Sequence, residues 1–205
     1  MATLDARIHL ASQSPRRREL LTQIGVRFDL LPFRGGPRSD PEISEEALPG
    51  EAPEAYALRV ALAKARFGQR LQALRHLPQR IVLAADTTLD LDGEIIGKPR
   101  DAADALAILS RLSGRAHRVL TAVAVAYQAR IESRLSISEV RFRELTDAEM
   151  RRYVATGEPH DKAGAYGIQG RAAIFVAEIR GSFSGIAGLP LCETALLLRD
   201  LGYPI

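Results

Sequence analysis

The sequence predicts a mixed α/β fold in which helices flank a sheet. Segments with the 3.6-residue periodicity of amphipathic helices alternate along the chain with short apolar or alternating segments typical of strands. Tight turns join some of these strands directly, which indicates antiparallel hairpins among the helices. The chain has 205 residues, of which 46% are hydrophobic and 26% are charged, so we expect one globular domain over residues 1–205.

The first 74 residues contain clear signals for helix boundaries. Ser14 is a suitable N-cap, Pro15 then takes the first helical position, and Gly25 ends the segment. A long loop rich in Pro, Gly, Ser and acids follows, and loops of this length in compact domains are usually functional. The predicted elements are a strand at 7–12, a helix from Pro15, a strand at 26–31, a loop at 32–53 and a helix at 54–74.

The rest of the chain combines hairpin and capping signals. Asp92 and Gly93 form a hairpin-type turn, and Thr146 with Glu149 matches a capping box. The predicted elements are a strand at 81–86, a hairpin over 88–97, a helix that begins near Asp101 and Asp104 and ends at Gly114, strands at about 116–127 and 130–143, a helix from Thr146 to near Gly157, a strand at 172–179 and a helix at 190–201.

The segment SQSPRRREL is the first candidate for chemistry. A strand that runs into a helix N-terminus presents free backbone N–H groups and the positive end of the helix dipole, and both attract anions. Ser12 and Ser14 add hydroxyl donors. Arg16 and Arg17 place cations where they oppose the dipole, which a bound anion would explain. The alternative is an ordinary N-cap followed by solvated arginines.

An acidic residue ends the apolar segment IVLAAD. Carboxylates at the carboxyl ends of strands in α/β proteins often face the ligand crevice, so we expect Asp86 to do so. An ionised carboxylate there can hold a divalent metal or can orient and deprotonate a water molecule. The alternative is a turn residue that closes the strand onto Thr87.

Lysine is rare in this chain. Only Lys64, Lys98 and Lys162 occur among 28 basic residues, which makes them candidates for phosphate-binding ammonium groups, with compositional chance as the alternative. Lys98 lies between Gly97 and Pro99, in a segment that lacks both the glycine spacing and the hydroxyl residue of a P-loop. A solvated turn lysine is the alternative reading of that position.

The segment GEPHDKAGAYGIQG is rich in glycine. Its glycines recur every third residue, at Gly164, Gly167 and Gly170, which would let the backbone approach a ligand closely. An acid, a cation and an amide that could read a base accompany them, although a plain glycine-rich connector remains an alternative. These three residues are Asp161, Lys162 and Gln169.

Four segments in this order resemble the Maf family of nucleoside triphosphate pyrophosphatases. They are LASQSPRRRELL, AADTTLDLDGEIIGKP, DKAGAYGIQG and GSFSGIAGLPL, and the similarity extends from Leu10 to about Leu198. The resemblance implies an ITPase-like fold of the Maf and Ham1 type, with two lobes around a cleft. It also implies dependence on Mg²⁺ or Mn²⁺ and cleavage at the α phosphate.

The resemblance also implies which residues act. Asp86 falls on the family's proton acceptor, and Arg16, Thr87 and Gln169 fall where the family's specificity varies. The combination is similar to the subgroup that acts on dTTP and UTP and differs from the 7-methyl-GTP subgroup. The other positions that match functional residues of the family are Ser12, Arg17, Lys64 and Lys98.

The acidic pair that family members usually carry after the second strand is replaced here. The segment FRGGPRSDP looks inserted, and Ser44-Glu45 is the best match. Glu45 is therefore expected to contact the metal or the substrate, with Asp40, Glu42 and Glu46 as alternatives.

The predicted reaction is the hydrolysis of dTTP and UTP to a monophosphate and pyrophosphate, without a covalent nucleophile. The arginines and lysines would bind the triphosphate, Asp86 and Glu45 would hold the metal, and Gln169 would read the pyrimidine. A nucleotide-sensing regulator of cell division with little turnover is the main alternative. A haloacid-dehalogenase phosphatase is disfavoured, because Glu94 replaces the threonine of its DxDGT motif.

Composition also bears on location and partners. No signal-peptide pattern or stretch long enough to span a bilayer occurs, and Cys192 is the single cysteine, so we expect a cytoplasmic protein. The net charge is only +3 and the arginines are scattered, which disfavours nucleic-acid binding. The family resemblance is compatible with a homodimer.

Overall fold

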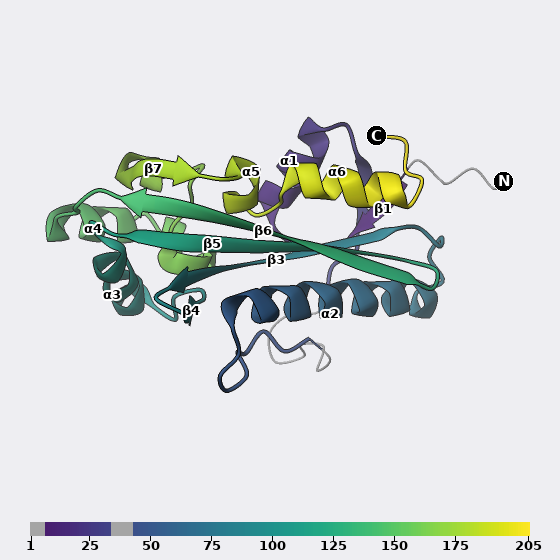
Figure 1. The fold of residues 1–205 in the computed structure, drawn as a ribbon, viewed down its shortest axis with the longest axis horizontal. Coiled ribbons are helices and arrows are strands. Elements are labelled where there is room, and N and C mark those ends of the chain that lie inside the picture. The colour runs from purple at the N-terminus through teal and green to yellow at the C-terminus, as the bar shows by residue number, and fades with distance from the viewer. Residues whose placement is uncertain (1–6, 34–42) are drawn as a thin grey trace.

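The computed structural model describes residues 7–33 and 43–205, which form a mixed seven-stranded sheet with helices on both faces (Figure 1). The strands are β1 (Arg7–Leu10), β2 (Arg27–Leu30), β3 (Val82–Leu91), β4 (Glu94–Ile96), β5 (Ala116–Tyr127), β6 (Arg130–Phe142) and β7 (Val176–Arg180). The helices are α1 (Pro15–Gln23), α2 (Pro53–Leu74), α3 (Ala102–Leu112), α4 (Asp147–Val154), α5 (Phe183–Ile186) and α6 (Leu191–Asp200), and the 3-10 turns are η2 (Glu158–Asp161), η3 (Ala163–Ala165) and η4 (Arg171–Phe175).

The sheet is interrupted along one edge of β3. The strand order is β2-β1-β3-β5-β6-β7, where β1 is parallel to β2 and β3, and β5, β6 and β7 join antiparallel. On the edge of β3 away from β5, pairing with β1 stops at Leu83 and pairing with β4 begins at Leu89. Between these points, residues 84–88 have no strand partner on that edge within the described chain. The cavity described below opens at this gap.

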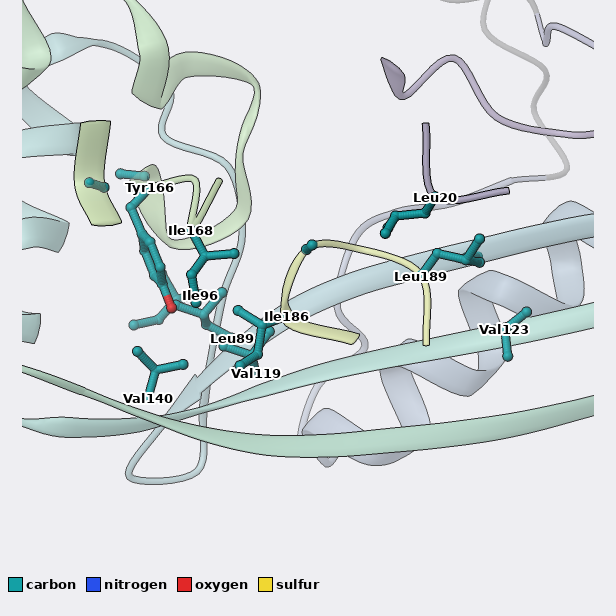
Figure 2. Close-up of a cluster of buried hydrophobic side chains, with 14 of the residues drawn as sticks. Leu20, Leu89, Ile96, Val119, Val123, Val140, Tyr166, Ile168, Ile186 and Leu189 are labelled. Atoms are coloured by element: carbon teal, nitrogen blue, oxygen red, sulfur yellow. The ribbon is translucent and has the colours of Figure 1, made fainter. Parts of the chain in front are cut away.

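The strict alternation of strand side chains separates two cores. Small residues of β3 and β5, such as Ala84 and Ala122, face α2 together with Ala57 and Ala61 of the helix. Larger residues on the other face of the sheet pack against α3, α4, α6 and the 3-10 turns, and Figure 2 shows part of that cluster around Leu89 and Val119. Even-numbered residues of β3 therefore point toward α2, which is the direction that Asp86 takes.

Helix α2 lies unusually close to the sheet. At Gly68 an added Cβ would come within 2.7 Å of Val82 Cγ1 and 3.3 Å of Ala11 Cβ. Alanines on both sides of the interface and a glycine at the closest point allow this approach. The proximity brings side chains of α2 within hydrogen-bonding distance of polar side chains on β3.

The mixed α/β fold with flanking helices is confirmed, and most predicted elements agree with it. The long helix, the 116–127 and 130–143 strand pair and the Thr146–Glu149 capping box are all present. Asp101 caps α3 by accepting from the backbone of Asp104. Ser14 occupies the N-cap position of α1 with Pro15 after it, although its side chain makes no capping bond.

Two expectations about elements are wrong. Asp86 does not end its strand, because β3 continues to Leu91 through residues that alternate between α2 and the opposite core. The strand predicted from residue 172 begins only at Val176, after the turn η4. The short helix α5 was not predicted. In the parts of the chain that the structure describes, every helix is too short or too polar to cross a membrane.

Candidate active site

One cavity of about 1010 Å³ opens at the gap beside β3. Its walls come from segments far apart in the sequence: the β1–α1 turn, residues near Glu45, helix α2, the middle of β3, the loop after β4, and residues 161–168 and 186–188. Predicted residues that line it are Ser12, Ser14, Arg16, Arg17, Glu45, Lys64, Asp86, Thr87, Lys98, Asp161, Lys162 and Gly167. Twelve predicted positions therefore share a single cavity.

The ammonium group of Lys64 is the centre of the charged part. Its Nζ lies 2.8 Å from Asp86 Oδ1 and 2.6 Å from Glu45 Oε1. The side chains of Lys64 and Asp86 are only 12% and 11% exposed, whereas that of Glu45 is 49% exposed. Burial alone would raise the pKa of Glu45, but the charge and hydrogen bond of Lys64, with Lys98 and Arg17 nearby, lower it. The carboxylate of Glu45 is therefore ionised at neutral pH.

The loop of residues 44–51, here called the Glu45 loop, is tied to α2. Tyr56 donates its hydroxyl to the carbonyl of Glu45 at 2.8 Å. Arg59, one turn further along the helix, donates to the carbonyls of Ser44 and Glu46 and binds both carboxylate oxygens of Glu51 at 2.6 and 2.8 Å. These bonds hold the Glu45 carboxylate over Lys64.

Arg17 reaches the cavity from α1 and is held by three acceptors. Its Nε donates to the carbonyl of Gly188 at 2.8 Å, Nη1 to Ser12 Oγ at 3.2 Å and Nη2 to Thr87 Oγ1 at 3.3 Å. Burial lowers the pKa of Arg17, and the charge of Asp86 partly opposes that effect. An arginine nevertheless stays protonated at neutral pH, so the cavity contains a fixed, partly desolvated cation.

A second set of charged side chains lines the cavity, from α1, the 161–162 segment and the loop after β4. Arg16 Nη1 lies 3.4 Å from Asp161 Oδ2, which links α1 to η2 across the cavity. Lys162 donates from Nζ to the carbonyl of Glu158 at 2.6 Å and to Asp161 at 2.7 Å, so its ammonium group is bound within its own loop. Lys98 is 61% exposed and its Nζ lies 4.0 Å from Glu45, which leaves it available to a ligand.

The glycines of the 157–170 segment have another role than predicted. An added Cβ at Gly164 would lie 2.1 Å from Leu89 Cδ2, one at Gly167 would lie 2.6 Å from Lys162 Cε, and one at Gly170 would lie 2.1 Å from Glu158 Oε1. The space beside each glycine is thus filled by a side chain of the protein itself. The expectation that these glycines let the backbone approach a ligand is wrong for Gly164 and Gly170, while Gly167 does line the cavity.

Gln169 is the predicted site residue that does not line the cavity. Its side chain is exposed, and the neighbouring Ile168 lines the wall instead. Of the alternatives to Glu45, Asp40 and Glu42 lie outside the described residues, and Glu46 is absent from the cavity wall.

Part of the cavity wall is apolar. Leu89, Val119 and Ile186 belong to it and lie next to each other in the core cluster, with Ile168 and Tyr166 beside them (Figure 2). A cavity wall with both charged and apolar parts suits a ligand that has a polyanionic part and an organic part.

Sequence reasoning missed several residues of the site. Tyr56 looked like a core residue of its helix, yet it also lines the cavity and binds the Glu45 loop. Its position eight residues before Lys64, about two helical turns, was the available signal. Residues 186–188 also line the cavity, and the serines and glycines of GSFSGIAG were the signal there.

The carboxylates suit a divalent metal. Oxygens of Asp86 and Glu45 converge on the single cation that Lys64 provides, which is the arrangement that a metal ion also requires. Within the described residues no group of three or more His, Cys, Asp or Glu side chains is close enough to hold a metal ion. A metal here would therefore take further ligands from water and substrate, as Mg²⁺ commonly does.

The chain is similar to several known proteins. The sequence model of the Maf family, described as Maf-like protein, matches residues 7–201. The chain is 64% identical to a dTTP/UTP pyrophosphatase of Aromatoleum aromaticum over the full length of both proteins. It is 60% identical to one of Dechloromonas aromatica, covering 96% of this chain and 98% of that protein. A solved Ham1 protein of Staphylococcus aureus is 17% identical with a TM-score of 0.44, covering 69% and 72% of the two chains.

Proposed function

Because the chain belongs to the Maf family, we propose that it is a nucleoside triphosphate pyrophosphatase that hydrolyses dTTP and UTP. The observation that supports this proposal most directly is the convergence of Arg17, Lys64 and Lys98 with Asp86 in one cavity. Such a set of cations matches the charge of a triphosphate, and a carboxylate among them can act on water. A protein that only senses nucleotides would not need that carboxylate.

The triphosphate binds at the charged part of the cavity wall in this proposal. Arg17 and Lys98 provide donors, and the N-terminus of α1 adds backbone N–H groups and the positive end of its dipole. Arg16 also lines this region, and its long bond to Asp161 is weak enough to be exchanged for a phosphate oxygen. The nucleoside would then lie against the apolar part of the wall near Leu89 and Ile186.

Asp86 is the residue we propose to act on the attacking water. Its side chain is 11% exposed and lies on the α2 face of β3, where Lys64 donates to one carboxylate oxygen. The other oxygen, Oδ2, stays available to a water molecule or a metal. A divalent cation held by Asp86 and Glu45 would neutralise charge on the phosphates when bound. In-line attack on the α phosphorus then breaks the bond to the β phosphate, and pyrophosphate leaves with the bridging oxygen.

The pyrimidine is not assigned to Gln169, which lies outside the cavity wall. The wall offers the backbone of Gly167 and the side chains of Ile168 and Thr87 in its place. We also propose that the enzyme works in the cytoplasm, where its substrates are made. Each of these assignments depends on the pyrophosphatase activity.

Replacing Asp86 by asparagine tests the proposal. Purified protein is incubated with Mg²⁺ and a panel of triphosphates, and monophosphate and pyrophosphate are both quantified. We expect dTTP and UTP to be the best substrates and Asp86→Asn to reduce kcat by roughly 10²-fold or more, the usual scale for loss of a general base. EDTA should abolish the activity of the unmodified enzyme.

Asp92→Asn is the matched control. Asp92 is an exposed carboxylate on the same β3–β4 hairpin, and its ion pair with Arg115 lies away from the cavity. This variant should retain the activity of the unmodified protein. Near-normal turnover by Asp86→Asn would remove this carboxylate from the mechanism, and release of orthophosphate in place of pyrophosphate would contradict the proposed reaction.

A further inference from the structure

We propose that Thr121 and the segment 181–188, here called the serine-glycine segment, position Arg17 for bidentate binding of a phosphate group. The inference rests on the proposed function only in assigning a phosphate ligand to Arg17. Thr121 is fully buried in β5 and does not line the cavity, so it acts through other residues. It lies directly opposite Thr87 of β3, whose hydroxyl accepts from Arg17.

The order of donors along this chain of groups is fixed by chemistry. The guanidinium of Arg17 can only donate, and the carbonyl of Gly185 can only accept. The hydroxyls of Thr121 and Thr87 lie 3.0 Å apart, and Thr121 Oγ1 lies 2.7 Å from the Gly185 oxygen. Each hydroxyl has one proton, so Thr121 donates to Gly185 and accepts from Thr87, which in turn accepts from Arg17. Thr121 thus joins Thr87 to the carbonyl of Gly185 in this chain of hydrogen bonds.

The serine-glycine segment is itself bound to the sheet. The backbone N–H of Ser182 donates to Ser138 Oγ at 2.9 Å, and the side chain of Ser182 caps α5 by accepting from Gly185. An added Cβ at Gly181 would lie 2.7 Å from Ser138 Oγ, and one at Gly185 would lie 2.8 Å from the hydroxyl of Ser136. A larger residue at either point would push these serine side chains aside, and the hydrogen bonds of Ser182 together with that of Thr121 restrain the carbonyl of Gly185.

The same segment binds Arg17 directly. The carbonyl of Gly188 accepts from Nε at 2.8 Å, while Ser12 and Thr87 each take one proton from a different terminal nitrogen. A guanidinium has five N–H groups, and three are used by these acceptors. Among the described residues, one N–H on each terminal nitrogen is left without an acceptor, and a guanidinium can bind a phosphate through two such donors.

Removal of the Thr121 hydroxyl tests this assignment. In Thr121→Val the hydroxyl of Thr87 loses its acceptor and can rotate, so Nη2 of Arg17 is no longer fixed. We expect a roughly 10-fold weaker affinity for inorganic pyrophosphate with Mg²⁺, measured by calorimetry, and a similar rise in KM for dTTP, on the scale of losing one charge-assisted hydrogen bond. Thr121→Ser retains the hydroxyl and should restore both values.

Two comparisons separate positioning from general damage to the fold. Thr194 is also fully buried, but its hydroxyl has no hydrogen-bond partner among the residues that the structure describes, so Thr194→Val should leave pyrophosphate affinity unchanged. In a protein that already carries Arg17→Ala, adding Thr121→Val should have no further effect on affinity. The non-additivity would show that Thr121 acts through Arg17.

The inference is overturned if Thr121→Val binds pyrophosphate as tightly as the unmodified protein, if Thr121→Ser behaves like the valine variant, or if the Thr121 and Arg17 effects add. The proposed function fails separately, if no triphosphate is hydrolysed. Non-additive effects on pyrophosphate binding would still support the positioning role in that case.

Discussion

Gly68 of α2 offers a quantitative test of how closely the helix must approach the sheet. In Gly68→Ala the new Cβ would lie 2.7 Å from Val82 Cγ1, about 1 Å inside the usual contact distance. Val82 is fully buried and β-branched, so it cannot turn away easily. Overpacking of this kind costs about 1–3 kcal/mol, and the better helix propensity of alanine returns about 1 kcal/mol. We expect a net destabilisation of about 1 kcal/mol.

Thermal unfolding measures this effect. For a protein of this size the predicted loss corresponds to a Tm lower by about 2–4 °C. Lys64 lies one turn before Gly68 on the same helix, so a shift of α2 also moves its ammonium group relative to Asp86. We therefore expect kcat to fall about 10-fold, since misplacement by 1 Å can cost 10²-fold.

Two sets of variants control the interpretation. Arg66 is exposed in the same helix, so comparing Arg66→Ala with Arg66→Gly measures helix propensity without the contact. Val82→Ala should be tolerated better in the Gly68→Ala protein than alone, because it removes the clash, with a coupling of about 1 kcal/mol or more. A higher Tm for Gly68→Ala, or strictly additive effects, would refute the account of close packing.

Two further predictions concern the Glu45 loop and a buried histidine. Arg59→Ala should release the Glu45 loop and raise the Mn²⁺ dissociation constant by roughly 10-fold, measured by titration without substrate. Arg143→Ala is the control, because Arg143 also donates to two backbone carbonyls and one carboxylate, but next to α4. This control variant should leave the Mn²⁺ dissociation constant unchanged. Burial lowers the pKa of His117 to about 4, below its unfolded value of 6.5, so its neutral form stabilises the fold above pH 6.5. That contribution, about 3 kcal/mol, should be lost as pH falls from 6.5 to 4. The free energy of unfolding, measured with denaturant, should therefore depend less on pH in His117→Gln than in the unmodified protein. Equal slopes of this free energy against pH in the two proteins would contradict the prediction.

Local patterns predicted much of the fold because they report local causes. The spacing of apolar residues located α2, and side-chain capping located the start of α3 and α4. The end of β3 could not be located in this way. Asp86, Thr88 and Asp90 break the apolar run, yet they remain in the strand because Lys64, the carbonyl of Ile96 and Arg118 satisfy them.

The sequence predicted most residues of the site but not the hydrogen bonds that hold them in place. The rarity of lysine and the cations of the first helix pointed to Lys64, Lys98 and Arg17, all of which line the cavity. The carbonyl that fixes Arg17 belongs to Gly188, 171 positions away, and backbone acceptors leave no trace in residue identity. Lys162 has the right chemistry and lines the cavity, but carbonyl and carboxylate groups of its own loop bind its ammonium group.

The gap along β3 has a mechanical consequence. Among the described residues, the segments on the two sides of the opening share no backbone ladder with each other at that edge, since β1 and β4 pair with separate stretches of β3. In the sheet, the parts on the two sides of the opening are joined by the long strands β3, β5 and β6, whose pairing runs past the gap. Any movement of the two walls relative to each other at this edge would therefore have to be taken up by bending or twisting of these three strands, because no ladder there links the walls directly.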